Sequence, residues 1–285
     1  MMDDNILILL DGDDINIRLA FTMVKSLNYD EVVSDRLREF PLYCLEYGVE
    51  MDYMINLKSL KIDHMGIDKL PDSIGELKNL ISLDISHNHL MYLPNSIGEL
   101  KNLEQLWLNN NFLVELPESI KNLCKLNMLS LHDNEFNHFP ESICKLQNIQ
   151  WIDCENNLIY ELPDSIGELK NLRELSFNHN YISKLPDSIG ELKNLRSLDV
   201  GFNKMIELPD TIGGLCKLFR LSVCDNYISE LPKSISKLKH ISSIDINDNP
   251  IVHIPEFIYE LESLNYLHHN DITINLKTSE TWKIR

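Results

Sequence analysis

The sequence has no long apolar run, which bears on where the protein is found. No stretch of its 285 residues approaches the roughly 20 apolar residues that a membrane-spanning helix requires. The short run from Ile6 to Leu10 follows Asp3 and Asp4 instead of the basic residues that precede a signal-peptide core. We therefore expect neither a membrane span nor a secretion signal.

Basic residues are also scarce. The chain has 26 lysines and arginines against 44 aspartates and glutamates, so its formal net charge is −18. A surface with this charge repels phosphate backbones and anionic lipid headgroups. We therefore expect neither a nucleic-acid partner nor a membrane partner.

Clustered cysteines are absent as well. No two of the six cysteines have CxxC spacing, and they are spread along the chain at Cys44, Cys124, Cys144, Cys154, Cys216 and Cys224. Dispersed single cysteines are typical of reduced thiols in a reducing compartment. The pattern predicts an intracellular, cytoplasmic protein.

No signature of catalysis or of a cofactor is present. The segment GGLCKL at Gly213 lacks the GxxxxGK[ST] pattern of a phosphate loop, and kinase and GxSxG signatures are missing. Asp11, Asp13 and Asp14 suggest a calcium loop, but Asn16 and Thr22 replace its required glycine and glutamate. We expect a protein that is not an enzyme and binds no cofactor or metal.

The main feature that the sequence does have is an internal repeat. LPDSIGELKNL begins at Leu70, Leu162 and Leu185, and LPNSIGELKNL begins at Leu93. From Leu57 the chain divides into nine units of 23 residues without insertion. Such a period is typical of a solenoid, in which each unit buries its apolar faces against its neighbours. The units begin at Leu57, Leu80, Leu103, Leu126, Ile149, Leu172, Leu195, Leu218 and Ile241.

Each unit has the pattern of a short strand followed by a short helix. Apolar residues occupy positions 1, 4, 6, 11, 14, 18 and 21. Alternation around positions 4 and 6 predicts a strand with one buried face. Proline at position 15 suits the first turn of a helix, and an acid follows it in seven of nine units, where it complements the helix dipole. Positions 18 and 21 would form the buried side of that helix.

Asparagine occupies position 9 in eight of the nine units, whereas the first unit has Met65 there. An amide side chain both donates and accepts hydrogen bonds, so it can satisfy backbone groups where the chain turns off the strand. We expect a structural role for the set Asn88, Asn111, Asn134, Asn157, Asn180, Asn203, Asn226 and Asn249.

The consensus LxxLxLxxNxLxxLPxSIGxLxxL resembles the 23-residue intracellular leucine-rich repeat of Ras-group and Scribble-type proteins. The resemblance extends from Leu57 to about Ser263, most of the chain. It implies an α/β fold: a curved, right-handed solenoid with a parallel sheet on its concave face and short helices on its convex face. It also implies a role in protein–protein association.

Outside the repeats we expect two caps. Residues 1–56 carry −8 of the net charge, and they predict two strands around the turn at Gly12, then helices from about Leu19 to Tyr53 with a break at Pro41. This segment suits a capping region, and an alternative is an adaptor module resembling a shortened Skp1- or BTB-like element. Residues 57–263 form the repeats. Residues 264–285 predict a degenerate tenth unit and C-terminal cap, with a last strand at Ile272, Ile274 and Leu276 and with Trp282 over the core edge.

Candidate binding residues lie at the variable positions 3, 5 and 7, which point away from the core onto the concave face. Most are small or charged, but Trp107, Met128 and Trp151 fall in three consecutive units. Exposed clusters of large apolar residues mark interaction sites, and tryptophan is enriched in binding hot spots. Mutual shielding of the rings is the alternative explanation. The surrounding residues are polar and mostly acidic: His132, Asp153, Glu155 and Glu174.

The sequence thus predicts a non-enzymatic scaffold that binds a protein partner on its concave face. The acidic surround favours a partner with a basic segment, and the resemblance makes small GTPases a candidate class. A second hypothesis is a substrate-recognition adaptor in a ubiquitin-ligase-type complex, with residues 1–56 as the recruiting module. His64 and His87, both at position 8, should approach each other, but two histidines alone do not make a metal site. Oligomeric state is left open.

Overall fold

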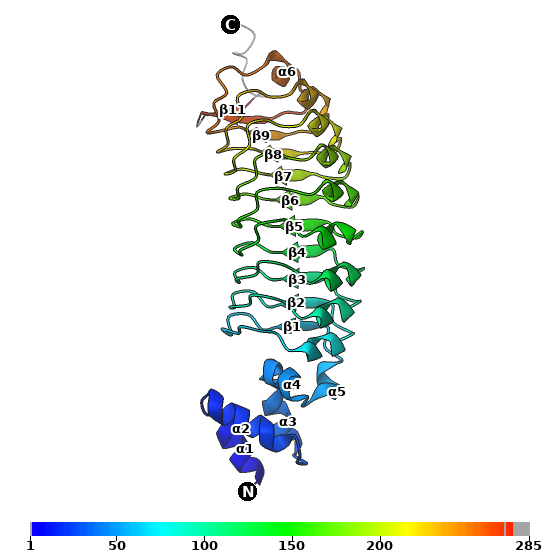
Figure 1. Cartoon of the computed structure of the whole chain (residues 1–285), viewed down its shortest axis with the longest axis vertical. Coiled ribbons are helices and arrows are strands. Elements are labelled where there is room, and N and C mark those ends of the chain that lie inside the picture. Colours follow the sequence, from blue (N-terminus) through cyan, green and yellow to red (C-terminus); the bar gives the residue numbers. More distant parts are fainter. Residues whose placement is uncertain (1, 271, 276–285) are drawn as a thin grey trace.

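The computed structural model describes residues 2–270 and 272–275, which form an elongated, curved solenoid on a helical base (Figure 1). Eleven strands stack in sequence order into one sheet, and the pairing is parallel throughout except between β10 and β11. The strands are β1 (Ser59–Lys61), β2 (Ser82–Asp84), β3 (Gln105–Trp107), β4 (Met128–Ser130), β5 (Trp151–Asp153), β6 (Glu174–Ser176), β7 (Ser197–Asp199), β8 (Arg220–Ser222), β9 (Ser243–Asp245), β10 (Tyr266–His269) and β11 (Ile272–Asn275).

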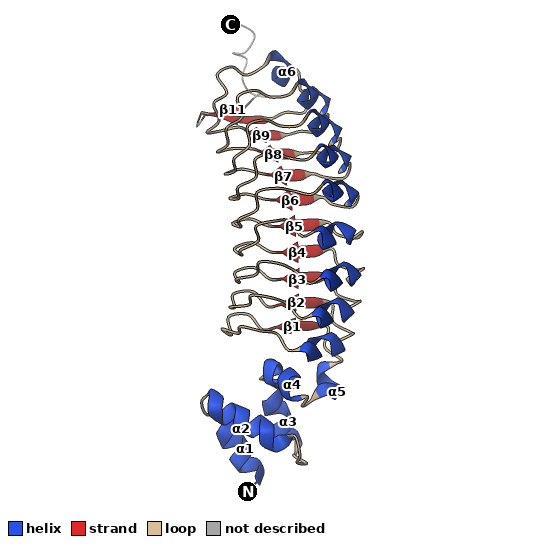
Figure 2. Cartoon of the chain, viewed as in Figure 1, coloured by secondary structure: helices blue, strands red, loops and turns tan. Residues whose placement is uncertain are grey.

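On the opposite side of the core, each repeat carries a single short helix (Figure 2). In the first eight repeats it is a 3₁₀ helix of five residues, and in the ninth it is α6 (Glu256–Tyr259). The eight are η1 (Asp72–Glu76), η2 (Asn95–Glu99), η3 (Glu118–Asn122), η4 (Glu141–Lys145), η5 (Asp164–Glu168), η6 (Asp187–Glu191), η7 (Asp210–Gly214) and η8 (Lys233–Lys237).

The 3₁₀ geometry follows from the spacing of the buried positions. A 3₁₀ helix has three residues per turn, so residues three apart lie on the same side. Ile74 and Leu77, at positions 18 and 21, are both fully buried, and Leu77 N donates to Ile74 O at 3.1 Å. The proline lies one residue earlier than predicted: Pro71 precedes η1 in extended conformation, and its carbonyl accepts the Ile74 N–H.

Glycine at position 19 lets neighbouring 3₁₀ helices approach closely. A Cβ atom on Gly75 would lie 2.7 Å from the backbone oxygen of Ser96, in the next repeat. A Cβ atom on Gly167 would lie 2.6 Å from the backbone oxygen of Ser188. Real Cβ atoms do not approach backbone this closely, so glycine permits the close packing at these two contacts, whereas Lys121, Cys144 and Ser236 occupy the position in other repeats.

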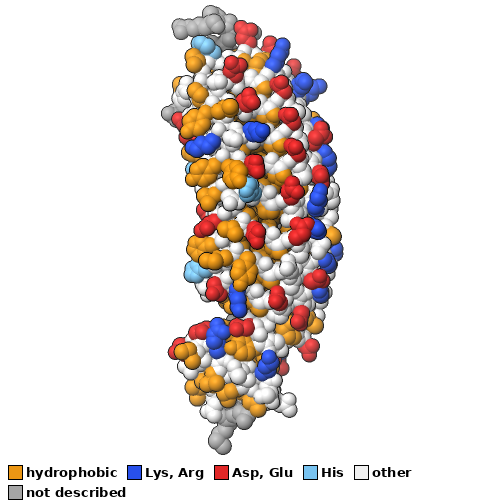
Figure 3. Space-filling model, in the orientation of Figure 1, with side chains coloured by type: hydrophobic (Ala, Val, Ile, Leu, Met, Phe, Trp, Pro, Cys, Tyr) orange, Lys and Arg blue, Asp and Glu red, His pale blue; other side chains and the backbone are white. Residues whose placement is uncertain are grey.

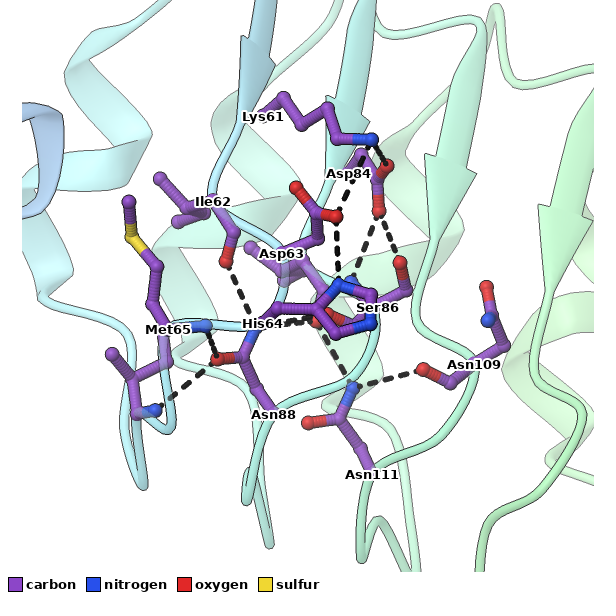
Figure 4. A network of polar contacts seen from close by, with 12 residues as sticks. Lys61, Ile62, Asp63, His64, Met65, Asp84, Ser86, Asn88, Asn109 and Asn111 are labelled. Atoms are coloured by element: carbon purple, nitrogen blue, oxygen red, sulfur yellow. Dashed lines mark hydrogen bonds and ion pairs between the residues drawn. The ribbon is translucent and has the colours of Figure 1, made fainter.

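The predicted role of the position-9 asparagines is confirmed. Asn111 is buried; its Nδ2 donates to Ile85 O of the preceding repeat and to Leu108 O of its own, both at 3.0 Å. Its Oδ1 accepts the Leu90 N–H of the preceding repeat at 3.0 Å. Asn88 makes the equivalent bonds to Ile62 and Ile67 (Figure 4). The ladder therefore joins each repeat to the one before it through backbone groups.

The predicted strands near the N-terminus are wrong. The segment is helical: α1 (Met2–Leu10) and α2 (Asp14–Val24), with Asp13 capping α2 by accepting the Asn16 N–H. Ile6 and Leu10 are buried while Ile8 is 68% exposed, which is the four-residue period of a helix and not the alternation of a strand. The run ILILL satisfies both periods, and the burial of Ile6 and Leu10 on one side of α1 distinguishes them.

The rest of the N-terminal segment is helical, as predicted. It contains α3 (Glu31–Arg38), α4 (Pro41–Tyr47) and α5 (Met51–Met54), with α4 beginning at Pro41 where the break was expected. Contact with the first repeat includes hydrogen bonds from Ser73 Oγ to Leu45 O at 2.6 Å and from Asn79 Nδ2 to Ile55 O at 2.9 Å. The buried side chains of α1–α5 continue the core of the repeats.

At the other end, the predicted last strand is present over its described part. Ile272 and Ile274 lie in β11, which pairs antiparallel with β10 and so ends the parallel series. His269 is partly buried and donates from Nε2 to Ile251 O at 3.0 Å. The predicted positions of Leu276 and Trp282 lie outside the described residues.

Candidate functional site

The predicted aromatic patch, defined as Trp107, Met128 and Trp151, lies on three adjacent strands of the concave face. Parallel pairing sets Trp107 beside Ser130 and Met128 beside Trp151. The Trp107 and Trp151 rings lean toward each other across β4, with centroids 5.7 Å apart and an interplanar angle of 49°. Ser130, which lies between Trp107 and Asp153 in the register, is only 1% exposed.

All three side chains of the aromatic patch are half-buried. The Trp107–Trp151 contact is the mutual shielding that the alternative explanation expects, and such a pair contributes about 1 kcal/mol. Shielding is incomplete, however, since each ring still presents surface to solvent at the centre of the face. The arrangement is a pre-formed apolar platform that a partner could cover without rearranging the sheet.

The acidic residues of the site surround this platform. Asp153 follows Ser130 and Glu174 follows Trp151 in the strand register. His132 and Glu155 lie two residues beyond the ends of β4 and β5 and are partly buried. The structure therefore brings together all seven residues that the sequence singles out.

The charged forms of the partly buried carboxylates Asp153 and Glu155 are destabilised by burial. Burial raises the pKa of Asp153, although the Glu155 N–H that it accepts at 3.0 Å opposes this rise. Burial and the Asp153 charge also raise the pKa of Glu155. Among the described residues, no lysine or arginine forms an ion pair with either carboxylate. A cationic group from outside would relieve both.

Asp153 also has a structural role that its repeat position explains. Aspartates at position 5 accept the backbone N–H two residues later, as Asp84 does from Ser86 at 3.1 Å (Figure 4). Asp199 and Asp245 make the same bond at 3.0 Å. The hydrogen bond thus accounts for aspartate at these positions, whereas the raised pKa of Asp153 reflects its own burial beside the aromatic patch.

Replacing Asp153 with asparagine should stabilise the protein at neutral pH. The variant keeps an acceptor for the Glu155 N–H and removes a partly desolvated charge. Since folding raises the pKa of Asp153, wild-type stability is greatest below its ordinary pKa of 3.8 and falls as the pH rises through the folded-state value. Urea unfolding at pH 4, 5.5 and 7 should show the advantage of Asp153→Asn growing with pH. Asp153→Ala, which also loses the hydrogen bond, should be less stable than Asp153→Asn; an advantage that shrinks with pH would contradict the assignment.

His132 has a neighbour that sequence reasoning missed. Its Nδ1 lies 2.8 Å from Asp133 Oδ2, so the acidic surround extends beyond the strand onto the following turn. Asp133 is in the left-handed region, with φ 53°, as is position 8 in every repeat. The predicted approach of His64 and His87 is confirmed, with stacked rings 4.1 Å apart. Within residues 2–270 and 272–275, no group of three or more potential ligands could hold a metal ion.

A second apolar surface lies on the flank formed by the turns between strand and proline. Figure 3 shows apolar side chains gathered on this flank and acidic ones nearer the helices. Each of these side chains is at least 40% exposed, and they occupy positions 8, 10, 12 and 13 of their repeats: Met91, Tyr92, Phe112, Val114, Leu158, Tyr160, Tyr181, Phe202, Ile206, Tyr227 and Val252. Comparing the residues at these positions across the repeats, in addition to positions 3, 5 and 7, would have revealed this apolar flank from the sequence.

The stacked parallel strands, the 23-residue period and the asparagine ladder define a repeat solenoid with an open concave face. Comparison with known families agrees: a leucine-rich repeat region profile matches residues 46–134, and a leucine rich repeat profile matches residues 153–205. The chain is a leucine-rich repeat protein. Proteins with this repeat generally mediate protein–protein interaction. No curated protein matches the chain.

Solved structures similar to this chain are also leucine-rich repeat proteins. A leucine-rich repeat protein of Leptospira interrogans is 27% identical with a TM-score of 0.51, over 80% of this chain and 69% of that one. A plant peptide hormone receptor, RGFR1, in complex with RGF2 is 28% identical with a TM-score of 0.62, over 78% of this chain. The ectodomain of the Arabidopsis thaliana receptor kinase GASSHO1/SCHENGEN3, in complex with CASPARIAN STRIP INTEGRITY FACTOR 2, is 25% identical with a TM-score of 0.62, over 77% of this chain.

This chain spans only 41% and 30% of those two plant chains. Among the described residues, no helix has the length and apolar character needed to cross a membrane.

Proposed function

We propose that the protein is a non-enzymatic scaffold that binds a protein partner on its concave face. The aromatic patch is the anchor, and Asp153, Glu155 and Glu174 with His132 select a basic segment of the partner. The observation that carries the proposal is the pair of partly buried carboxylates beside a pre-formed aromatic platform. Two of the similar plant receptors are in complex with RGF2 and CASPARIAN STRIP INTEGRITY FACTOR 2, which supports a protein or peptide ligand for this fold.

The proposal extends to the partner class and location that the sequence suggests. Small GTPases that present a basic segment to the acidic surround are one such class. The dispersed cysteines support an intracellular, cytoplasmic setting. Cys44, Cys144 and Cys154 are buried free thiols, and burial raises the pKa of each, so they are unreactive core residues.

A second candidate is an adaptor in a ubiquitin-ligase-type complex, with residues 1–56 as the recruiting module. The observation that favours it is the internal packing of this segment: Phe21 is fully buried and stacks on Tyr43 at 5.5 Å. A segment that serves as a cap needs only one apolar face, whereas this one has its own aromatic cluster. In that case the concave face would select the substrate.

Loss of both tryptophans should abolish partner recovery. Affinity purification with mass spectrometry first identifies the partner, and Trp107→Ala/Trp151→Ala is then compared with wild type by titration. Hot-spot tryptophans contribute about 2 kcal/mol or more each, so affinity should fall by at least about 100-fold. Tyr181→Ala/Tyr227→Ala removes two exposed aromatic rings from the apolar flank and should bind normally. Unchanged affinity of the tryptophan variant, with unaltered unfolding, would refute the proposal.

A further inference from the structure

Toward the C-terminal end of the sheet, beside the same concave face, lies an open hollow of about 650 Å³. It lies between the β6–β8 strands and the turns that lead into them. Its lining includes four residues with basic side chains, one carboxylate and one aromatic ring: Arg196, Lys217, Arg220, His240, Glu174 and Phe219. All six are exposed. Comparing equivalent positions of the repeats did not reveal this cluster, because its members come from different repeat positions.

The cations of this hollow have no acidic partner among the described residues, whereas some lysines of the solenoid pair with a glutamate of the next repeat. Lys78, Lys145 and Lys170 each pair with a glutamate of the following repeat, at 3.1, 2.8 and 3.4 Å. Within the described residues, by contrast, Arg196 and Arg220 make no side-chain hydrogen bond and no ion pair. Lys217 Nζ donates to the neutral Asn194 Oδ1 at 2.8 Å. The chain has a net charge of −18, yet this hollow gathers three cations without an acidic partner. Such a group forms a favourable binding site for an anion.

The local charge of the hollow suits a dianion. With His240 neutral, Arg196, Lys217 and Arg220 contribute three positive charges and Glu174 one negative charge, which leaves a net charge of +2. A phosphate monoester carries about −1.5 to −2 at neutral pH, and arginines bind it through paired N–H donors. The charge of the whole chain does not prevent this, because charges farther than about 8 Å are largely screened at physiological ionic strength.

The hollow also has a wall against which a peptide can pack. Phe219 is 49% exposed and offers an apolar surface next to the cations. In the strand register Arg220 is three strands beyond Trp151, through Glu174 and Ser197. At a strand spacing near 4.8 Å this is about 15 Å, or four to five residues of an extended peptide. A partner segment lying across the sheet could therefore reach from the aromatic patch to the hollow.

We propose that the hollow formed by Arg196, Lys217, Arg220 and Phe219 binds a phosphorylated serine or threonine side chain on an extended segment of a partner protein. The hollow is separate from the aromatic patch and has a net positive charge, although it shares Glu174 with the acidic surround. Its occupancy depends on the phosphate, so kinases and phosphatases that act on the partner would regulate binding to this face. The inference goes beyond the proposed function and does not depend on it.

The test uses three immobilised-peptide libraries that have degenerate flanks and a fixed central phosphoserine, serine or glutamate. Full-length wild-type protein should be retained at least tenfold more by the phosphoserine library than by either other library. Arg196→Gln/Arg220→Gln, which keeps polar side chains and removes both charges, should be retained equally by all three. Lys184→Gln/Lys204→Gln removes the same charge from exposed sites outside the hollow and should behave as wild type.

The same experiment separates this inference from the proposed function. Trp107→Ala/Trp151→Ala should keep its preference for phosphoserine, whatever its effect on partner binding. Equal retention of wild type by the phosphoserine and glutamate libraries would overturn the inference, since a carboxylate would then suffice. An equal loss of preference in the lysine control would also overturn it, because the effect would reflect overall charge.

Discussion

Replacing Asn203 with alanine is expected to lower the free energy of unfolding by about 3 to 5 kcal/mol. Asn203 is 1% exposed; its Nδ2 donates to Phe177 O, Val200 O and Gly201 O at 2.9, 3.1 and 2.8 Å. Its Oδ1 accepts the buried Ile182 N–H at 2.9 Å.

The carbonyls keep other donors, since Asn180 still bonds to Phe177 O and Asn226 to Val200 O. The Ile182 N–H loses the side-chain acceptor and is left buried without a partner. An orphaned buried donor costs about 1 to 3 kcal/mol, and the lost hydrogen bonds add about 1 kcal/mol each, partly offset by these other donors. The largest single contribution should therefore come from the Ile182 amide.

Urea denaturation followed by far-ultraviolet circular dichroism measures this loss. Asn137→Ala is a matched control, because Asn137 is an exposed asparagine whose side chain makes no hydrogen bond in the described structure. Its free energy of unfolding should stay within about 0.5 kcal/mol of the wild-type value, which is the range of ordinary surface substitutions. Equal midpoints for Asn203→Ala and wild type would show that the ladder does not stabilise the solenoid.

Deleting residues 1–52 is expected to make the chain aggregate or unfold. We propose that the N-terminal segment caps the first repeat, which has no preceding repeat to cover it. Leu60, Ile62 and Ile74 of that repeat are at most 5% exposed in the full chain. Each large apolar side chain freed by the deletion costs about 1.5 to 3 kcal/mol, and a solenoid with an open end is a template for association.

Size-exclusion chromatography and circular dichroism of the truncated chain provide the measurement. A shorter deletion, of residues 1–10, removes α1 and leaves α4 and α5 against the first repeat, so its solenoid should remain folded and monodisperse. If deletion of residues 1–52 instead gives a folded chain that still binds the partner, the segment is a recruiting module and the adaptor hypothesis gains. The limits 1–56, 57–263 and 264–285 stay predictions until such truncations are made.

The repeat could be read from the sequence because its framework residues recur at fixed intervals. Nine copies of the same pattern make the register of Trp107, Met128 and Trp151 on adjacent strands a matter of counting. The helices at the N-terminus could not be read in this way, since the run ILILL occurs once and fits either period. Packing distinguishes the two, since Ile6 and Leu10, four residues apart, are both buried in the core.

The candidate site was predictable in its membership but not in its physics. Counting columns placed Trp107 near Trp151, yet it could not show that the rings touch or that burial raises the pKa of Asp153. It also missed the left-handed residue at position 8, which is histidine in some repeats and Phe202 in another. The signal was nevertheless present, since position 8 is His, Asn or Asp in eight of the nine repeats, and these residue types adopt the left-handed region more readily than most.

The asparagine ladder has a direction, and this direction matters while the chain is being made. Each amide side chain completes the backbone of the repeat before it, as Asn88 does for Met65 and Ile67. The first repeat has nothing before it to complete, and there the position is held by Met65. On a ribosome, every newly emerged repeat must therefore wait for about one further repeat before its own buried amides are satisfied. Folding that proceeds with synthesis would lag the emerging chain by a constant 23 residues, instead of waiting for the whole protein.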